Sequence, residues 1–335
     1  MSVVELVSVV VIGRNEGARL ERCLRSVAAT QVGDFGVETI YVDSGSSDGS
    51  VALAERLGAT TIGLRAERPT AAMGRNAGWK IARGEIVLFL DGDTVLAPRF
   101  VAESLGEFGD PGVAVVWGHR REMFPERSIY NRVLDLDWVY APGLTAFCGG
   151  DALFRRTVLE QTGGFDETLI AGEEPELCRR ILGLGFGILH VDRAMTGHDL
   201  AMTRFGQYWR RATRAGHAFA EVSERFRGTA NPFWLADARR NRNRALVLLG
   251  GALLAVILSL MLFSVWPLVV VASLFLLLVL RTAYKARWKS RDGLALVLYG
   301  VHSHLQQIPI FVGQVQFRMN RRRGQRASLV EYKQG

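Results

Sequence analysis

The chain has 335 residues, enough for one large domain with extra elements or for two ordinary domains. Its formal net charge is +8, and arginines in the segments 239–244 and 318–326 supply much of the excess. These basic segments flank strongly apolar ones, which favours anionic lipid headgroups over nucleic acid as their partner. The three cysteines, Cys23, Cys148 and Cys178, are too few and too widely spaced for a disulfide framework or a zinc site.

The first half of the chain alternates strand and helix patterns. The β-branched run at 6–12 is typical of a strand buried on both faces, and it is too short for a secretory signal peptide. Further strands are predicted at 37–42, 60–64 and 85–90, separated by helices at 17–29, 48–57 and 70–82. This alternation indicates an α/β fold with a mostly parallel sheet. Because ligands of such sheets bind at the carboxyl ends of the strands, polar residues that follow a strand are the first candidates for a site.

The pattern becomes less regular over residues 113–150. A helix at 175–184 and a strand at 186–191 follow, and residues 231–244 read as a polar, basic linker. We therefore place the folded domain at residues 1–230.

Two apolar runs follow the linker. Residues 245–263 carry no charge, and a second run covers 268–280. A helix needs about 20 apolar residues to span a bilayer, and Pro267 argues against one long buried helix. We predict a transmembrane helical hairpin at 245–284. Basic residues flank both of its ends, so the positive-inside rule makes this a multi-pass protein of the cell inner membrane with a cytoplasmic folded domain.

The remaining residues, 285–335, hold another apolar stretch at 294–312. It carries polar residues, among them His302 and His304. If it spanned the membrane, the arginine-rich tail would lie outside, against the same rule. We therefore predict an interfacial or re-entrant segment with a basic tail, and a third span is the alternative.

The strongest chemical signal is Asp91-Gly92-Asp93, directly after the strand at 85–90. Two carboxylates two residues apart at a strand end can both reach one Mg²⁺ or Mn²⁺, hard cations that prefer oxygen ligands and bridge substrate phosphates. Such an ion neutralises the charge on a departing diphosphate. A solvated turn is the alternative, and the position after a buried strand favours the metal.

Three other segments follow strands or open onto the same edge of the sheet: GRNEG from Gly13, DSGSSDG from Asp43 and GRNAG from Gly74. A carboxylate can accept hydrogen bonds from a base or from ribose hydroxyls, and an arginine can pair with phosphate. For the segment from Asp43, an ordinary capped turn explains the same residues.

Together these segments resemble the inverting family 2 glycosyltransferases of the GT-A fold, in particular their membrane-anchored bacterial type. The resemblance covers roughly residues 6–215 and is carried by VVVIGRNEGARLERCLRSV, YVDSGSSDGS, GRNAGWKIARGEIVLFLDGDT, CGGDALFRR and GGFDETLIAGEEPELCRR. It implies a UDP- or GDP-sugar donor, a Mg²⁺ or Mn²⁺ ion, and a single displacement with inversion.

Carried over residue by residue, the resemblance assigns the donor's base, ribose and diphosphate to Asn15, Glu16, Asp43, Arg75 and Asp91. The metal would be held by Asp91, Asp93 and His198. A histidine of the surface or the core is the alternative for His198. The acceptor side would include Gly149, Gly150 and Asp151.

The general base of the family ends an acidic pair at the start of a helix, and here the pair is Glu173-Glu174, followed by Pro175. Proline at the first helical position fits a helix that begins there. Glu174 could then take the acceptor hydroxyl's proton, and the helix N-terminus would lower its pKa and keep it ionised. Aspartate is usual at this position, and a helix-capping glutamate is the alternative.

Residues 207–211 resemble the Q-x-x-R-W motif of processive polysaccharide synthases. Gln207 and Arg210 match on the acceptor side, but Arg211 replaces the tryptophan that stacks on the acceptor sugar. That departure puts processivity in doubt. A basic amphipathic helix at the membrane over 204–214 is the other interpretation.

Rival functions make different demands on the sequence. A dinucleotide oxidoreductase needs G-x-G-x-x-G after the first strand, and residues 13–17 do not provide it. A non-catalytic membrane scaffold predicts decayed carboxylates, whereas Asp91, Asp93 and Glu174 are all acidic. A processive synthase needs more spans unless the chain oligomerises. We therefore expect metal-dependent inverting transfer of a sugar to a membrane-associated lipid or lipid-linked acceptor.

Overall fold

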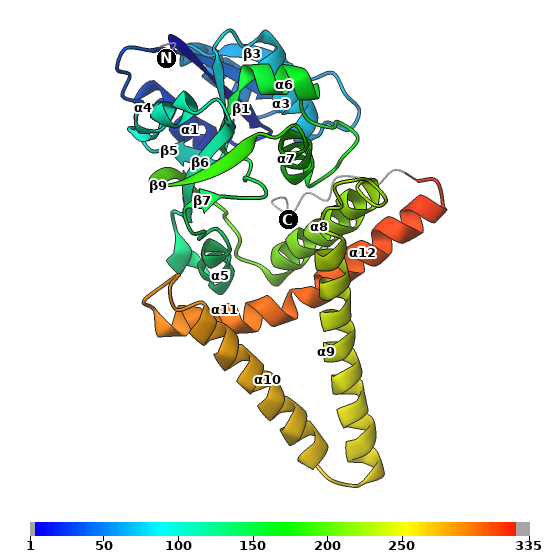
Figure 1. Cartoon of the computed structure of the whole chain (residues 1–335). Helices are drawn as coiled ribbons and strands as arrows, with labels where there is room; N and C mark the ends of the chain where they lie inside the picture. Colours follow the sequence, from blue (N-terminus) through cyan, green and yellow to red (C-terminus); the bar gives the residue numbers. More distant parts are fainter. Residues whose placement is uncertain (1–3, 326–335) are drawn as a thin grey trace. The chain divides into compact units, whose positions relative to one another are not determined.

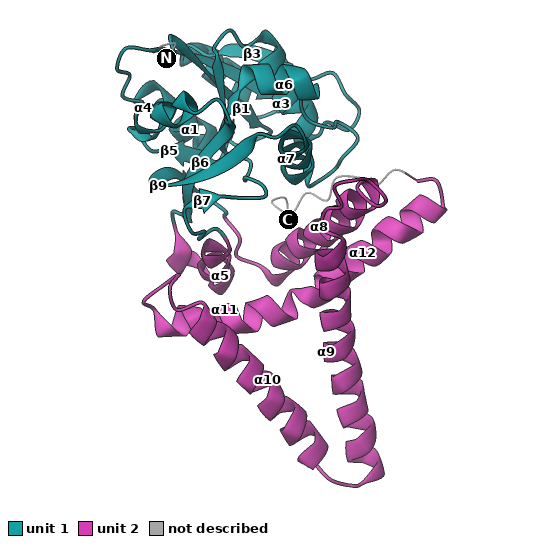
Figure 2. Ribbon diagram, in the orientation of Figure 1, with its two compact units in different colours: residues 1–123, 138–200 teal, residues 124–137, 201–335 magenta. Residues whose placement is uncertain are grey.

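The structure is a computed structural model that describes residues 4–325 (Figure 1). It consists of two compact units, coloured separately in Figure 2. Unit 1 comprises Met1–Met123 and Trp138–Leu200, and unit 2 comprises Phe124–Asp137 and Ala201–Gly335. Unit 1 thus ends at Leu200. The predicted end of the folded domain at residue 230 stays a prediction.

Unit 1 is built on a sheet with the strand order β3-β2-β1-β4-β8-β6-β9-β5. Its first four strands are mutually parallel, with helices between them, as predicted. The elements are β1 (Leu6–Gly13), α1 (Ala18–Ala28), β2 (Gly36–Asp43), α2 (Ser50–Arg56), β3 (Thr60–Gly63), α3 (Ala71–Ile81) and β4 (Ile86–Asp91). The predicted α/β GT-A fold is therefore confirmed.

The other half of the sheet mixes strand directions. Strand β8 runs antiparallel to both of its neighbours, β4 and β6, while β9 runs parallel to β6. Short β5 and β7 both pair antiparallel with β9. The elements are β5 (Thr94–Leu96), α4 (Phe100–Ser104), η1 (Leu105–Gly109), β6 (Val113–Glu122), β7 (Gly143–Leu144), β8 (Ala152–Arg155), α6 (Arg156–Thr162), α7 (Glu173–Gly183) and β9 (Gly187–His198).

Two sequence predictions in this half were wrong. Residues 113–150, expected to be irregular, contain the ten-residue strand β6, and β9 continues to His198 instead of ending at residue 191. Both strands begin apolar and end in polar residues, so their second halves lack the hydrophobic pattern of a strand. The two polar halves pair with each other, up to Glu122 with His198. Backbone pairing between β6 and β9 therefore continues both strands into segments whose side chains lack the pattern typical of a strand.

Strand β1 forms the centre of the parallel half, between β2 and β4. Val7, Val10 and Val11 are fully buried. Helix α3 packs closely on β1 because Gly78 has no side chain: a Cβ there would lie 2.2 Å from Cγ1 of Val10. This close approach brings Arg75, one turn earlier on α3, to the carboxyl edge of the sheet.

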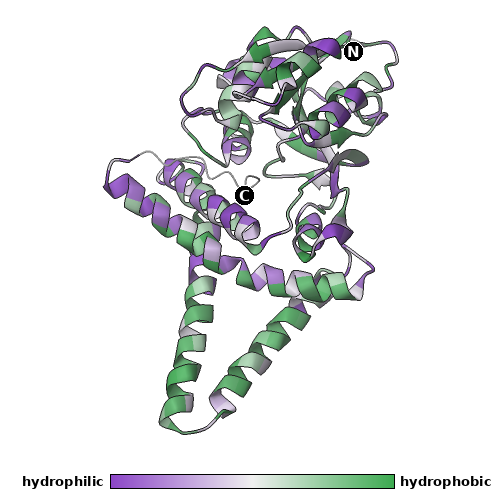
Figure 3. Ribbon diagram, turned by 180° about the vertical axis from the view of Figure 1, so that it is seen from behind, coloured by the Kyte–Doolittle hydropathy of each residue, from purple (hydrophilic) through white to green (hydrophobic). Residues whose placement is uncertain are grey.

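Unit 2 is helical and includes two long apolar helices, α9 and α10. Its elements are η2 (Pro125–Arg127), α5 (Ile129–Asp137), α8 (Phe205–Arg225), α9 (Leu235–Met261), α10 (Trp266–Lys285), α11 (Gly293–Leu305) and α12 (Gln307–Arg322). By length and composition α9 and α10 could each cross a membrane, and only 11% of each apolar window is buried. In Figure 3 both helices are mostly green, the colour of hydrophobic residues, on the parts that run to the turn between them. The chain turns between them at residues 262–265, just before Pro267, as predicted for a hairpin.

Helix α9 starts earlier than the apolar run. Residues 235–244, interpreted as part of a basic linker, form its first turns. Alanine, leucine and arginine are strong helix formers, so this polar segment continues the apolar helix without a break.

Helices α11 and α12 cover the predicted interfacial segment. With 13 and 16 residues, both are shorter than a span requires. His302 on α11 is buried, bonded to the Tyr208 hydroxyl of α8 at 2.9 Å and to the Asp137 carboxylate of α5 at 3.0 Å. Helix α12 crosses α8 at two glycines, and a Cβ on Gly216 would lie 1.9 Å from the carbonyl oxygen of Ile310. The membrane placement of this segment stays a prediction, and the last ten residues of the basic tail lie outside the described residues.

Candidate active site

The carboxyl ends of β2, β1 and β4 bring three of the predicted segments together. The register pairs Gly13 with Asp43 and Ile12 with Asp91, so the three strand ends lie side by side. Asn15, at φ 53°, ties the first loop to the second. The side-chain Oδ1 of Asn15 accepts from the backbone amide of Ser47 at 2.8 Å, and the backbone amide of Asn15 donates to the hydroxyl of Ser46 at 2.9 Å.

Asp43 is buried and organises the second loop. One carboxylate oxygen accepts from the Tyr41 hydroxyl at 2.9 Å, and the other accepts from the amides of Gly45 at 2.9 Å and Ser46 at 2.7 Å. The capped turn considered from the sequence is therefore present. Asp43 sits at the strand edge, with its oxygens occupied by the protein.

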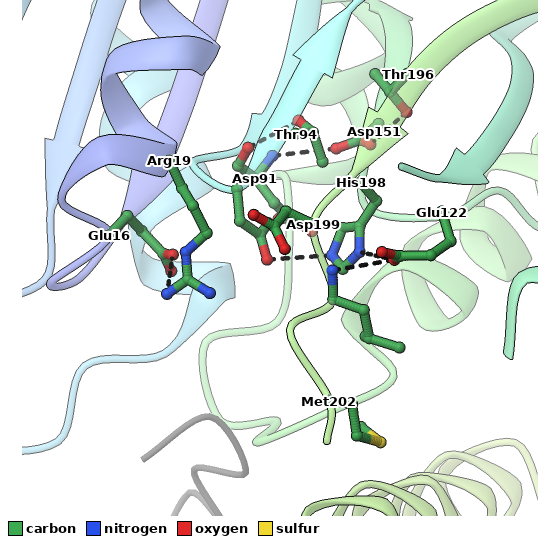
Figure 4. A network of polar contacts seen from close by, with 12 residues as sticks. Glu16, Arg19, Asp91, Thr94, Glu122, Asp151, Thr196, His198, Asp199 and Met202 are labelled. Carbon is green, nitrogen blue, oxygen red and sulfur yellow. Dashed lines mark hydrogen bonds and ion pairs between the residues drawn. The ribbon is translucent and has the colours of Figure 1, made fainter. Parts of the chain in front are cut away.

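Glu16 lies beside the Asp91-Gly92-Asp93 turn. A Cβ on Gly92 would be 3.3 Å from Cγ of Glu16, and the Gly92 amide donates to the carbonyl of Ile12 at 2.8 Å. The Glu16 carboxylate pairs with Arg19 at 2.9 Å (Figure 4). The first loop and the aspartate turn thus form one continuous rim.

Arg75 links this rim to the start of α7. Its guanidinium is 2% exposed and lies 3.0 Å from the Asp91 carboxylate, 2.9 Å from Glu173 and 3.0 Å from Glu174. Buried arginine with several carboxylates is a costly arrangement that persists when each charge has a partner. Arg75, Asp91, Glu173 and Glu174 form one charged cluster. The side chains of Asp91 and Glu174 are 30% and 17% exposed, so these two carboxylates are the members of the cluster open to a ligand.

The electrostatics of the cluster differ from one carboxylate to the next. Burial favours the neutral form of Asp91, but the charges of Arg75 and Arg120 outweigh it and hold its pKa below the usual value. For Glu174, burial and then the charge of Glu173 raise the pKa to about 7, although Arg75 opposes them. The predicted lowering of the Glu174 pKa by the helix N-terminus is therefore wrong. A base with a pKa near 7 still suits proton abstraction at neutral pH.

Helix α7 also starts earlier than predicted. Glu173 is its first residue, after Gly172 at φ 85°, so Pro175 is the third residue and not the first. Proline is tolerated there because the amides of a first helical turn have no partner within the helix. Both glutamates consequently lie within the first turn.

Asp93 faces His198 across the end of the sheet. The His198 Nε2 lies 3.1 Å from an Asp93 carboxylate oxygen, and both residues are buried. On the other side of the ring, Nδ1 lies 3.7 Å from the carboxylate of Glu122 (Figure 4). His198 ends β9 and pairs in register with Thr94 of β5 and with Glu122 of β6. The sequence prediction did not include Glu122.

Asp91, Asp93 and His198 are the candidate donors for a divalent cation. Within residues 4–325 no group of three or more histidine, cysteine, aspartate or glutamate side chains has the geometry of a metal site. Asp93 and His198 nevertheless provide two adjacent donors, and Asp91 provides a partly exposed carboxylate two residues away. Mg²⁺ is commonly bound through one or two carboxylates, with waters and substrate phosphates as the other ligands. The residues therefore fit a cation that is shared with a diphosphate.

Asp91 also contacts Asp151 and Arg120. Asp151 is fully buried, and its oxygens accept from the Asp91 amide at 3.1 Å and the Thr196 hydroxyl at 2.8 Å (Figure 4). Arg120 lies 3.5 Å from the Asp91 carboxylate and 3.6 Å from that of Asp151. Asp151 thus fixes the backbone of Asp91 to strand β9 through Thr196. Arg120 was missed because the strand that carries it, β6, was not predicted.

The loop before β8 presses its backbone onto the cluster. A Cβ on Gly150 would lie 2.7 Å from Nη2 of Arg75 and 3.0 Å from Oδ2 of Asp91, whereas a Cβ on Gly149 would meet nothing within 4 Å. The loop is held against α7 by the buried thiols of Cys148 and Cys178, whose sulfurs are 3.6 Å apart.

The remaining predicted residues, Gln207 and Arg210, lie on α8 in unit 2. Gln207 is buried, and its side-chain oxygen accepts from the amides of Thr203 at 2.9 Å and Arg204 at 3.0 Å. The glutamine of the motif therefore caps the start of its own helix.

Comparison with known proteins places this arrangement in a family. The model of "Glycosyl transferase family 2" matches residues 8–163, and that of "Glycosyl transferase family group 2" matches residues 86–284. The chain belongs to the family 2 glycosyltransferases and is an enzyme of that class.

Relatives and solved structures agree with this assignment. The chain is 23% identical to glycosyltransferase AglE of Haloferax volcanii over 66% of its own length and 75% of AglE. It is 29% identical to the pre-mycofactocin glycosyltransferase of Mycobacterium tuberculosis over 75% of its length, but spans only 52% of that protein.

Two solved structures share the fold. The mannosyltransferase PcManGT of Pyrobaculum calidifontis, in complex with GDP-Man and Mn²⁺, has a TM-score of 0.63 and 22% identity, covering 95% of this chain and 88% of that one. Staphylococcus aureus TarS 1–349 with UDP-GlcNAc has a TM-score of 0.54 and 14% identity, covering 96% and 92%. At these identities the likeness concerns the fold alone.

Proposed function

We propose that the protein transfers a sugar from a nucleoside-diphosphate sugar to a membrane-associated lipid or lipid-linked acceptor, with inversion at the anomeric carbon and with the help of Mg²⁺ or Mn²⁺. The observation that carries the proposal is the position of Arg75. Its buried guanidinium contacts Asp91 at the strand edge and Glu174 at the start of α7. One residue thus connects the donor side to the candidate base.

The donor assignment rests on the rim formed by the first loop, Asp43 and Asp91. These groups lie at the carboxyl edge of a parallel sheet, where ligands of such folds bind. PcManGT and TarS, which share the fold, were solved with GDP-Man and UDP-GlcNAc. A nucleotide sugar with either base therefore fits the proposal.

The proposed reaction is a single displacement. Glu174 accepts the proton of the acceptor hydroxyl as that oxygen forms its bond to the anomeric carbon, and the bond from this carbon to the diphosphate oxygen breaks. Glu174 is partly exposed, and its pKa of about 7 leaves much of it ionised at neutral pH. Arg75 holds the base and Asp91 in fixed relation, which limits the reorganisation needed during transfer.

Asp93, His198 and Asp91 would hold the cation. When bound, it would neutralise charge on the departing diphosphate. Glu122, on the far side of the His198 ring, would orient the histidine.

The acceptor class rests on α9 and α10, which are long and apolar enough to span a membrane. An enzyme tethered by such a hairpin meets acceptors embedded in the bilayer far more often than soluble ones. The basic residues at both ends of the hairpin support a cytoplasmic catalytic unit at the cell inner membrane.

The test is release of nucleoside diphosphate from a panel of UDP- and GDP-sugars, with purified full-length protein in lipid vesicles containing lipid extracts. We expect release with one donor class, dependent on Mn²⁺ or Mg²⁺ and abolished by EDTA. Turnover that is unaffected by EDTA would contradict the metal assignment. Donor binding without turnover on any acceptor would favour the scaffold interpretation.

A further inference from the structure

Unit 2 contains a cleft of about 910 Å³ at the basic ends of α9 and α10, next to α11. It is of the size that small-molecule sites commonly have. Six basic residues line it: Arg239, Arg240, Arg244, Arg281, Lys285 and Lys289. None of the described residues that line it is acidic.

Several of these cations have no acidic partner among the described residues. Among residues 4–325, Arg239, Arg244 and Arg281 form no ion pair, while Arg240 lies 3.6 Å from the Asp237 carboxylate. Lys289 is held in place by the carbonyl of Leu136 at 2.7 Å. Several unpaired cations around one cavity repel one another, so an anion with several oxygens would be strongly attracted there. Guanidinium groups match phosphate oxygens particularly well.

The rest of the cleft has a different chemistry. Val247, Leu248 and Leu278 belong to the apolar stretches of the hairpin and form part of the wall. Trp288 and Tyr299 add aromatic rings, which are typical of the membrane–water boundary. A ligand that fills this cleft therefore has an anionic end and a hydrocarbon end.

The two helices of the hairpin are spread apart at their basic ends, which leaves room there for such a ligand. In Figure 1, α9 and α10 meet at their uncharged turn and diverge toward the ends that carry the basic residues. Helix α11 lies against α10 near that end, where Thr282 and His304 are 3.0 Å apart. The cleft thus opens at the level of lipid headgroups if the hairpin spans the bilayer.

We propose that this cleft binds an anionic lipid, one whose phosphate-containing headgroup carries a net negative charge, with the phosphate among Arg239, Arg244 and Arg281 and the hydrocarbon chain along the apolar wall. The proposal rests on the membrane anchoring proposed above, but not on the chemistry of the catalytic site. Either a bulk anionic phospholipid or a prenyl phosphate has the required chemistry.

The test measures lipid retention by native mass spectrometry of the full-length protein. The protein is taken from phosphatidylcholine vesicles that contain a minor fraction of phosphatidylglycerol, of a long-chain prenyl phosphate, or of neither. We expect the anionic lipid, phosphatidylglycerol or the prenyl phosphate, to be retained in either or both of the first two samples, and the comparison identifies its source. Equal retention of phosphatidylcholine would overturn the proposal.

Matched variants locate the lipid. The triple variant Arg239→Gln, Arg244→Gln, Arg281→Gln should weaken retention about a hundredfold, since each cation near a membrane surface contributes about 1 kcal/mol. The control triple Arg242→Gln, Arg287→Gln, Arg291→Gln removes the same charge from neighbouring positions that do not line the cleft. Equal losses in both triples, or no loss in the first, would overturn the site.

Two further measurements keep the result interpretable. If the first triple does not fold, judged by its melting curve, the single variant Arg281→Gln replaces it, with Arg287→Gln as its control. Flotation with pure phosphatidylcholine vesicles tests the anchoring separately. A protein that floats but retains no anionic lipid contradicts the cleft proposal alone, whereas one that does not float contradicts the proposed membrane anchor.

Discussion

The guanidinium of Arg75 lies 3.0 Å from the carboxylate of Glu174, and the two residues come from helices that are almost a hundred positions apart in the chain. The contact joins α3, which packs on the central strand β1, to the first turn of α7. Any change that displaces Arg75 should therefore disturb both Asp91 and the candidate base.

Gly150→Ala tests this dependence without removing a functional group. The new Cβ would lie 2.7 Å from Arg75 Nη2 and 3.3 Å from Glu174 Oε1, so the cluster has to shift. We expect turnover to fall by at least about tenfold, because misplaced reacting groups lose much of their orientation advantage. Gly149→Ala is the matched control, since its Cβ meets nothing within 4 Å. Equal activities of the two variants would show that the cluster tolerates displacement.

Glu174→Gln preserves shape and removes the basic group. Turnover should fall by about a hundredfold or more, the usual range for the loss of a general base. Donor affinity, measured by calorimetric titration with nucleoside diphosphate, should change little. Glu173→Gln is the comparison, although it also removes the 2.9 Å contact to Arg75. If Glu173→Gln loses turnover and Glu174→Gln does not, the other member of the pair is the base.

The raised pKa of Glu174 predicts two dependences on pH. The rate kcat/KM should fall below about pH 7 as the base becomes protonated, and this limb should be absent from Glu174→Gln. Stability should follow the opposite direction. The folded state holds the proton of Glu174 more tightly than the unfolded chain does. The contribution of this proton to the free energy of unfolding is therefore fully present below the usual pKa of 4.5 and is lost as pH rises through about 7.

Thermal melting of the two proteins checks that sign. Glu174→Gln should gain Tm relative to the wild type as pH rises from 4.5 through 7. A constant difference between the two melting curves over this range would mean that the pKa is not raised.

Asp93→Ala should abolish turnover while the protein stays folded. The substitution removes the carboxylate that faces His198 at 3.1 Å, and with it one of the donors for the cation. Mn²⁺-dependent nucleotide binding should be lost, whereas circular dichroism should match the wild type. Asp192→Ala, on an exposed carboxylate of the same strand β9, is the control. Metal-dependent turnover near the wild-type level in Asp93→Ala would contradict the assignment.

The orientation of the hairpin can be tested with single cysteines, since Cys23, Cys148 and Cys178 are buried. Ser264→Cys lies in the turn between α9 and α10, and Thr229→Cys lies in the exposed segment before α9. A membrane-impermeant maleimide should label Ser264→Cys in cells with a permeabilised outer envelope, and Thr229→Cys only after lysis. The reverse pattern would place the catalytic unit on the outside.

The sequence predicted the parallel half of the sheet because its two central strands, β1 and β4, are buried on both faces and read as continuous apolar runs. Asp91 and Asp93 could be located for the same reason, since β4 is the most apolar of these strands. Arg120 and Glu122 could not, because they stand in the polar half of β6, where strand structure depends on pairing with β9.

The pKa of Glu174 was misjudged for a related reason. Its sign depends on burial and on the neighbouring charge of Glu173, and neither effect can be inferred from the start of a helix alone. Similarly, Gln207 matched a motif of acceptor binding, yet its oxygen caps the helix that carries it.

The glycine crossing of α8 and α12 has a consequence for how the protein is made. Helix α8 leaves the ribosome before α9, α10 and α11, whereas α12 leaves after them. The face of α8 around Gly216 therefore lacks its partner until α12 has been synthesised, and such non-local contacts form late in folding. A chain that ends before α12 would carry this face uncovered and would tend to aggregate, even with every residue of the active site in place.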